Sequence, residues 1–544
     1  MFLAFWITTL ILYWPTHQAG FVTDVTGGIE RLTNQPFWKI GTCFGFPALN
    51  QLSVFAFYSC YQLFGTVGLP WYLIFCGLHA ANAILLWDFS HRLFQCYVQN
   101  AKVITFLGAL LFLVHPYQSE VLVWRACFNY LLVTFFALQH WRRLWKFLDE
   151  TEGDTHLKNP GWWQLHLYFL LALFTFELAL VIPLIDLIIY LLFQQKEHPK
   201  RKFCNYFQQI SIPQSIALAG YFLLHRLLFG TWIGHYGAAT HLQFSPTYLL
   251  DNLAKYIIKY GLLVRSYGHY EKVFIFEMCE HYGWQVLLGI TVLLGFIGLV
   301  FKKKISRKHF LIIGLTGCTV LALLPVLNLY FYYLQAIEND RYGYFASVFG
   351  LPLIVLLIYQ LPKILRYLLL ITYFSASCFL LVRTNQIWQQ STEVFYHLLE
   401  DYRWHNEENV VILNIPDNYQ GAYLFRIIGR GSGFQDALTT IGQKPVKGKI
   451  WEVAQYNMTQ LTDGVKVNVL DKNRVKVSFN QWGNWWWRNG VGVGPTHKRS
   501  IYTVYFKGPF YELELINPPN DAVFIYQDGL RWKKVVRGSS GSWQ

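Results

Sequence analysis

Long apolar runs separated by short polar segments fill the first three-quarters of this 544-residue chain. A helix that crosses a bilayer needs about 20 mostly apolar residues, and eleven runs approach or reach that length. They lie at about Phe2–Trp14, Pro70–Leu93, Val103–Val114, Tyr130–Trp141, Trp163–Phe176, Leu178–Phe193, Ile212–Phe229, Trp284–Phe301, Phe310–Leu327, Gly343–Leu361 and Leu365–Val382. The pattern predicts an all-α polytopic membrane domain with about eleven spanning helices.

The pattern changes beyond Val382. A helical stretch around Gln386–Tyr402 is followed by short alternating runs of β-branched and aromatic residues, such as Val475–Phe479 and Ile501–Phe506. Turn signals such as Pro416-Asp417-Asn418 separate these runs, as expected for strands. We therefore expect three parts: a multi-span membrane domain at 1–383, a connecting helix at 384–404 and a small, mainly-β soluble domain at 405–544.

Composition supports a membrane protein. Hydrophobic residues make up 54% of the chain and charged residues only 14%, against about 25% charged in a typical soluble domain. The net charge of +14 could indicate nucleic-acid binding, but the basic residues form short clusters between apolar runs. That arrangement is typical of membrane topology, so we predict the lipid bilayer as a partner and no nucleic acid.

The basic clusters also set the orientation. They lie at 142–146, 196–202, 302–308 and 363–366. All four fall on one side of the membrane if the eleven runs are the spans, and the positive-inside rule makes that side cytoplasmic. The N-terminus is then cytoplasmic and the β domain lies outside, as do two long segments at about Pro15–Gly68 and Gly230–Gly283.

Three acids fall at or near the predicted outer surface. Asp24 follows the first span and could act as a general base, or be a solvated loop acid. His115 and Glu120 end the third span, although Pro116 alone would explain a helix end there. Glu177 lies among apolar residues, where an acid at membrane depth indicates function; alternatively, it marks an outer turn between two short spans.

A predicted outer loop carries Asp340, Arg341 and Tyr342. The guanidinium of Arg341 could bind a lipid phosphate with two hydrogen bonds, or pair within the loop with Asp340 or Glu338. His79 is a weaker candidate of the same kind. The nine cysteines have no zinc-ligand spacing, and the sequence does not decide whether a divalent metal is needed.

The order of these signals resembles the GT-C class of membrane glycosyltransferases. The motifs are Asp24, then Leu78-His79-Ala80-Ala81-Asn82, His115-Pro116 to Glu120, Phe176-Glu177-Leu178 and Asp340-Arg341-Tyr342. The nearest pattern is that of bacterial relatives of the transmembrane and tetratricopeptide-repeat protein O-mannosyltransferases, over roughly residues 1–390. Val25 stands where that family often has a second acid, and a β domain replaces the repeats.

The resemblance implies a GT-C-like fold and a hexosyltransferase or mannosyltransferase-like enzyme. It would move a sugar from a polyprenyl phosphate carrier to a hydroxyl of a protein, lipid or glycan outside the cytoplasm. Asp24 would be the base of an inverting single displacement, and Arg341 would stabilise the departing phosphate. The other residues assigned to binding donor or substrate are Glu120, Glu177, His115, His79, Asp340 and Tyr342. The lipid-linked sugar is the donor, and no cofactor is certain.

The expected location is a bacterial inner membrane, with the C-terminal domain in the periplasm. A polymerase or ligase of lipid-linked oligosaccharides is the alternative enzyme. A transporter would predict inverted repeats and broken helices that meet at the midplane, which the sequence does not display. A membrane scaffold that carries the β domain is the remaining alternative.

Overall fold

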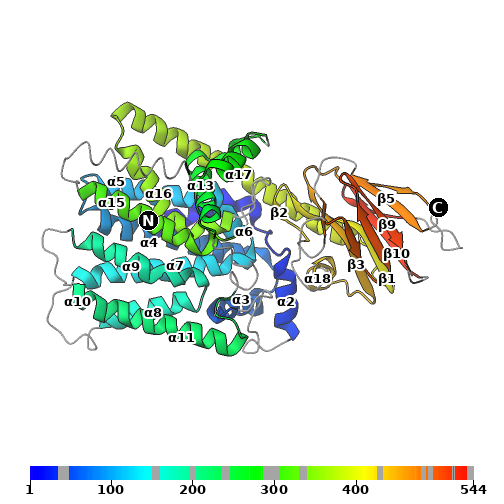
Figure 1. Cartoon of the computed structure of the whole chain (residues 1–544), viewed down its shortest axis with the longest axis horizontal. Coiled ribbons are helices and arrows are strands. Elements are labelled where there is room, and N and C mark those ends of the chain that lie inside the picture. The colour runs from blue at the N-terminus through cyan, green and yellow to red at the C-terminus, as the bar shows by residue number, and fades with distance from the viewer. Residues whose placement is uncertain are drawn as a thin grey trace.

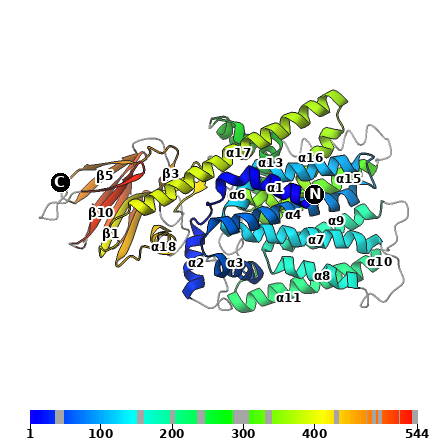
Figure 2. The same cartoon turned by 180° about the vertical axis from the view of Figure 1, so that it is seen from behind.

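The computed structural model describes residues 1–34, 48–149, 160–195, 203–234, 245–268, 270–283, 285, 307–329, 340–425, 433–471, 473–479, 485–487, 494–516, 519 and 521–535. Long helices run side by side at one end of the molecule, and a β domain lies at the other end (Figure 1). One long helix, α17, joins the two parts (Figure 2).

The regular elements in the described part of residues 1–401 are all helices. The longer helices are α1 (Phe2–Tyr13), α2 (Asp24–Asn34), α3 (Gln51–Phe64), α4 (Gly68–Phe94), α5 (Ala101–Val114), α7 (Phe128–Asp149), α8 (Pro160–Leu173), α9 (Ile182–Phe193), α11 (Ile212–Phe229), α13 (Pro246–Leu262), α15 (Arg307–Leu323), α16 (Tyr344–Tyr359) and α17 (Lys363–Asp401). The shorter ones include η3 (Pro116–Gln118), α6 (Ser119–Val123), η4 (Arg125–Cys127), η6 (Glu177–Val181), α10 (Phe203–Tyr206), η8 (Val264–Ser266) and η10 (Asp340–Gly343).

The described residues contain five helices long and apolar enough to cross a membrane, or six if a bent pair counts as one span. This confirms a helical part with several candidate spans, but not the predicted count of eleven. Two predicted runs form the shorter apolar helices α8 and α9, which the 3-10 turn η6 separates. The predicted run at Trp284–Phe301 lies outside the described residues, apart from residue 285.

The bent pair has a local cause. Helix α5 ends at Val114, and the chain then turns by 54° into Pro116–Val123. Pro116 lacks an N–H to continue the hydrogen-bond ladder of α5, and it disfavours helical backbone at His115. His115 is accordingly extended, with φ −71° and ψ 131°. The break carries the short helix α6 to the end of the bundle that faces the β domain.

Helix α17 contains 39 residues, which gives a length of about 58 Å at 1.5 Å per residue. The predicted last span and the predicted connecting helix are therefore one continuous helix. Its first half lies along the bundle and its second half reaches the β domain (Figure 2).

The β domain contains two sheets. The first has the order β11-β10-β1-β3-β6, with β2 paired to β1; strand β1 is parallel to both β10 and β3. The second is an antiparallel sheet in the order β4-β5-β9-β8-β7. The strands are β1 (Asn409–Tyr419), β2 (Ala422–Tyr423), β3 (Lys449–Met458), β4 (Val465–Val469), β5 (Arg474–Phe479), β6 (Trp485–Trp487), β7 (Thr496–Lys498), β8 (Tyr502–Phe506), β9 (Phe510–Leu515), β10 (Val523–Asp528) and β11 (Arg531–Lys534). Strand β1 is buried from Val410 onwards, as expected for a parallel strand covered on both faces.

The two parts of the molecule are in contact. Helix α2 stands at the end of the bundle next to α18 (Gly433–Thr440) of the β domain, and the two helices pack together (Figure 2). The short strand β2 also touches the second half of α17. Several of the predicted site residues lie at this junction.

Candidate functional site

An ion pair between Glu120 and Arg341 lies at the centre of the junction. The Arg341 Nη1 atom is 2.5 Å from Glu120 Oε1, and the Arg341 backbone N–H donates to Oε2 at 2.7 Å. The Glu120 side chain is fully buried. The backbone N–H and the guanidinium of Arg341 together bind both carboxylate oxygens of Glu120. These contacts hold α6 and η10 together, although 221 positions separate the two residues. Arg341 therefore pairs with Glu120, and not with Asp340.

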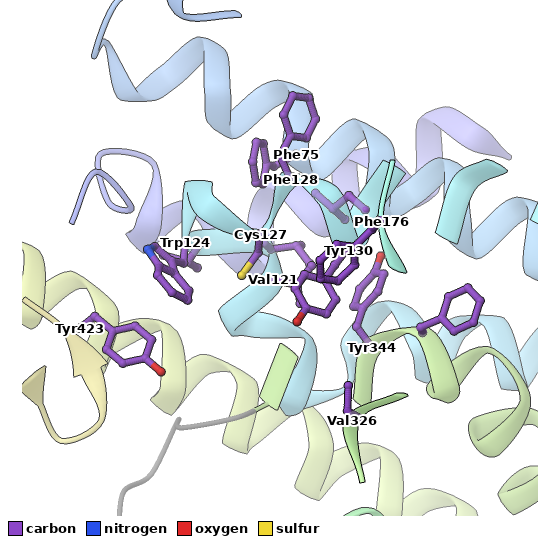
Figure 3. Close-up of a cluster of buried hydrophobic side chains, with 14 of the residues drawn as sticks. Phe75, Val121, Trp124, Cys127, Phe128, Tyr130, Phe176, Val326, Tyr344 and Tyr423 are labelled. Carbon is purple, nitrogen blue, oxygen red and sulfur yellow. The ribbon is translucent and has the colours of Figure 1, made fainter. Parts of the chain in front are cut away.

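Aromatic side chains surround this ion pair. The Arg341 guanidinium carbon lies 4.5 Å from the ring centre of Tyr342, 5.1 Å from Trp124 and 6.0 Å from Tyr423. Figure 3 shows Trp124 and Tyr423 on one side of a buried apolar group that also holds Cys127 and Tyr130. We name Glu120, Arg341, Trp124, Tyr342 and Tyr423 the junction cluster. Because rings exclude water, they strengthen the charge interactions beside them.

Asp340, the residue before Arg341, is held by two cations. Its Oδ1 lies 2.7 Å from Lys259 Nζ, and its Oδ2 pairs with the Arg265 guanidinium. Arg265 Nη1 also donates to the Pro116 carbonyl at 3.0 Å and to Thr384 Oγ1 at 2.9 Å. Arg265 thus links η8, the break after α5, and α17.

A further cation, Lys272, stands near this pair. Burial, then the neighbouring Arg265 and Arg383 lower the pKa of Lys272 to about 8, while Asp340 raises it. Burial and neighbouring cations both disfavour the charged form of a lysine. We name Lys259, Arg265, Lys272 and Asp340 the basic cluster; among described residues it has three cations and one carboxylate.

Asp24 lies at the start of α2 and is partly buried. Its position relative to the ion pair follows from Cys127: burial first, and then Glu120 and Asp24, raise the pKa of the Cys127 thiol, while Arg341 lowers it. Asp24 is therefore in the electrostatic neighbourhood of the Glu120–Arg341 pair. The preceding segment is fixed, since Thr23 N–H donates to the Leu424 carbonyl at 3.2 Å and Trp124 Nε1 donates to the Val22 carbonyl at 3.4 Å.

His115 borders the same region but is fully buried. Its ring stacks on Tyr260 at 5.1 Å with an interplanar angle of 10°, and its Nδ1 accepts from the Tyr117 N–H at 3.4 Å. Tyr117 in turn lies under both cations, 5.0 Å from Lys259 Nζ and 4.7 Å from the Arg265 guanidinium. His115 thus supports the ring on which the basic cluster rests.

His79 and Glu177 are placed differently. His79 is buried in the bundle, where Nδ1 contacts the Tyr344 hydroxyl at 2.9 Å and Nε2 contacts the Leu113 carbonyl at 3.2 Å. Glu177 is buried at the start of η6, close enough to Tyr221 to interact with it electrostatically. The structure therefore brings together Asp24, Glu120, Asp340, Arg341 and Tyr342, with His115 alongside. It holds His79 in the interior of the bundle.

Sequence reasoning missed Lys259, Arg265 and Tyr423. Lys259 belongs to the long segment at about Gly230–Gly283 that the sequence places outside the membrane. Lys255 and Lys259 are buried through contacts with distant parts of the chain, which no local sequence pattern marks. No local signal marked Tyr423, which comes from the other domain.

The described residues contain no group of three or more His, Cys, Asp or Glu side chains that could hold a metal ion. The residues at the junction instead present cations and hydrogen-bond donors. Such groups bind anions, and phosphate in particular.

No protein-family model matches the sequence, and no protein of curated function matches it. Two solved structures are similar to this chain, both of ArnT from Cupriavidus metallidurans. The apo form has 8% identity and a TM-score of 0.39, over 82% of this chain and 89% of that one. The form bound to undecaprenyl phosphate has 8% identity and a TM-score of 0.37, over 84% of this chain and 92% of that one. Similarity at this level identifies neither the family nor the activity of this chain.

Proposed function

We propose that this protein is a membrane glycosyltransferase that moves a sugar from a polyprenyl phosphate carrier to an acceptor hydroxyl outside the cytoplasm. One observation carries the proposal: the basic cluster lies beside the Glu120–Arg341 pair at the ends of the helices, where a lipid phosphate would sit. The order of the sequence motifs that resemble GT-C enzymes supports it independently.

The basic cluster is the part of the site best suited to the donor phosphate. Lys259 and Arg265 are mostly buried and share one carboxylate, Asp340. Burying cations costs free energy unless anions compensate them. A phosphate placed next to Lys272 would add a negative charge and would raise the pKa of that lysine.

The reaction would be a single displacement. Asp24 takes the proton from the acceptor hydroxyl as its oxygen attacks the anomeric carbon. The new carbon–oxygen bond forms as the bond from the anomeric carbon to the phosphate oxygen breaks, and the electron pair leaves with the lipid phosphate. The configuration at the anomeric carbon is inverted. Arg341 and the basic cluster stabilise the negative charge that develops on the phosphate.

The remaining residues would bind and orient. Glu120 holds Arg341 and, with Glu177, orients the acceptor or the sugar. Asp340 holds Lys259 and Arg265 in place, Tyr342 packs on the Arg341 guanidinium, and His115 supports Tyr117. His79 would have a structural role, in the packing of helices inside the bundle. The proposed location is a bacterial inner membrane, with the N-terminus in the cytoplasm and the β domain in the periplasm.

The test compares cells that carry the wild-type protein with cells that carry Asp24→Asn at equal membrane abundance. Asparagine keeps the size and the hydrogen-bonding ability of a residue at a helix start, so we expect the fold to persist. Loss of a general base lowers the rate by about 10²–10⁴-fold. One glycan modification should disappear while the polyprenyl-phosphate sugar accumulates.

Glu30→Gln is the matched control, because Glu30 is an exposed acid on the same helix. Its glycan profile should equal that of the wild type. Unchanged glycans and lipid-linked sugars in Asp24→Asn would contradict the assignment of the base. A profile that is the same with and without the protein would contradict the glycosyltransferase itself, in favour of the transporter or scaffold.

A further inference from the structure

A hairpin of the β domain reaches into the junction. Strands β1 and β2 are joined by Gln420 and Gly421, whose φ angles of 50° and 93° are both positive. Two such residues between paired strands form the tight turn that matches strand twist. Asn418 Oδ1 also accepts the Gly421 N–H at 2.9 Å. The hairpin is therefore a defined structure whose outgoing strand carries Tyr423.

The membrane part holds this hairpin by its backbone. Ser391 Oγ of α17 lies 3.2 Å from the Ala422 carbonyl and 3.1 Å from the Tyr423 carbonyl, and donates to them. On the other side, the Leu424 carbonyl accepts from Thr23, one residue before the candidate base. Residues 422–425 are all buried. Hydrogen bonds from two separate elements and complete burial mean that the hairpin is built into the junction.

The Tyr423 side chain then completes the surroundings of Arg341. Its hydroxyl accepts from Arg341 Nη1 at 3.0 Å, and its ring packs on Trp124 with 4.7 Å between centroids. The same Nη1 atom binds Glu120, so the two partners share one nitrogen. Among the described contacts of the Arg341 side chain, Tyr423 is the one that the β domain contributes.

We propose that Tyr423 is a positioning residue, and that the β domain thereby completes the active site. A guanidinium is planar, so partners on Nη1 and Nη2 fix both its position and its rotation. Tyr342 accepts from Nη2 at 3.0 Å, whereas Glu120 and Tyr423 act on Nη1. Without the Tyr423 hydroxyl, Arg341 keeps its ion pair but gains rotational freedom. The assignment rests on the proposed function, because it concerns the group that stabilises the leaving phosphate.

Full-length protein in lipid nanodiscs can test this with three variants. Tyr423→Phe removes only the hydroxyl, Tyr423→Ala removes the ring as well, and Tyr419→Phe is the control. Tyr419 lies on the same hairpin, and its hydroxyl binds the neighbouring Gln420 at 3.4 Å. Two properties are measured: hydrogen exchange of the peptide that contains Arg341, and kcat and KM for transfer from a polyprenyl-phosphate sugar.

We expect Tyr423→Phe to speed exchange at the Arg341 amide and to lower kcat, each by about tenfold, with donor KM within twofold. Tyr419→Phe should have the exchange rate and kcat of the wild type. Tyr423→Ala should show faster exchange and a lower kcat than Tyr423→Phe. Exchange and kcat of Tyr423→Phe equal to those of the wild type would overturn the proposal. If neither the wild type nor any variant transfers sugar, but Tyr423→Phe still speeds hydrogen exchange, the positioning contact stands and the glycosyltransferase proposal fails.

Discussion

Two buried groups, each built around a carboxylate, lie before and within α7. One is the Glu120–Arg341 pair with the basic cluster, just before the helix begins. The other joins His140, in the second half of α7, to Asp186 of α9 at 2.7 Å. Both involve a carboxylate that is fully buried, yet they differ in how many lysine and arginine side chains lie around it.

In the second group, hydrogen bonds enclose the carboxylate. Asp186 accepts from His140 Nε2, from Trp141 Nε1 at 3.1 Å and from Gln214 Nε2 at 2.6 Å. The other His140 nitrogen faces the Leu165 carbonyl at 3.0 Å, so both ring nitrogens of His140 have a partner. Side chains of the bundle thus contact both carboxylate oxygens of Asp186. Such a closed arrangement joins α7, α9 and α11 and leaves little charge with which to bind a ligand.

The junction carries more cations than carboxylates. Among described residues, Lys259, Arg265, Lys272 and Arg341 face the carboxylates of Glu120 and Asp340, with Asp24 in the same electrostatic neighbourhood. Excess positive charge costs stability, and it is retained where an anion must bind. The difference between the groups separates a structural ion pair from a candidate site more clearly than burial does. Three predictions can break or sharpen this comparison.

The largest effect is expected at the α7–α9 pair. Asp186→Asn weakens three buried hydrogen bonds to a carboxylate, so the free energy of unfolding should fall by about 3 kcal/mol. Sugar transfer per folded molecule should stay within twofold of the wild type. Thermal unfolding in detergent and transfer assays on the folded fraction measure the two quantities.

Asp88→Asn provides the comparison for that variant. Asp88 pairs with Arg92 and Arg142, but it is partly exposed, so we expect a loss under about 1 kcal/mol. Unchanged stability together with lost transfer in Asp186→Asn would reverse our interpretation and make the α7–α9 pair part of the site.

The next effect is expected at Arg265. Arg265→Met removes a cation from Asp340 and from the proposed phosphate position, and a hydrogen bond to a charged group contributes about 1.5–3 kcal/mol. Donor KM should therefore rise by about thirtyfold, with a smaller change in kcat. Arg403→Met is the control, since the Arg403 side chain is 81% exposed. Equal donor KM in wild type and Arg265→Met would separate the basic cluster from the donor.

The features that sequence reasoning predicted are those with a local cause. Pro116 breaks α5, apolar runs become helices, and turn residues divide the strands of the β domain. The acid-containing motifs also identified five residues that meet at the junction, and each lies at or near the start of a helix or 3-10 turn. The continuous α17 was not predicted, because its polar second half gives no sign that it extends a span.

Features that depend on distant contacts were missed. Asp186 lies within a run interpreted only as a span, and its partners come from 28 to 46 positions away. Arg265 reaches Asp340 across 75 positions, and Tyr423 reaches Arg341 across 82. No pattern of period 2 or 3.6 encodes such pairings, since they follow from how helices and domains pack.

The smallest expected effect is a change of donor KM with pH. It tests whether the basic cluster binds the donor phosphate. Lys272 has a pKa of about 8 in the unliganded protein. The ammonium form of Lys272 attracts phosphate, so bound donor raises the pKa of Lys272. Donor affinity is therefore highest below pH 8, and it falls as the pH rises toward the Lys272 pKa of the complex. Donor KM should rise by about fivefold between pH 7 and pH 9.

Lys272→Arg should flatten this rise, because arginine stays charged throughout. An identical rise in wild type and Lys272→Arg would assign the pH dependence to another group and remove Lys272 from the donor site.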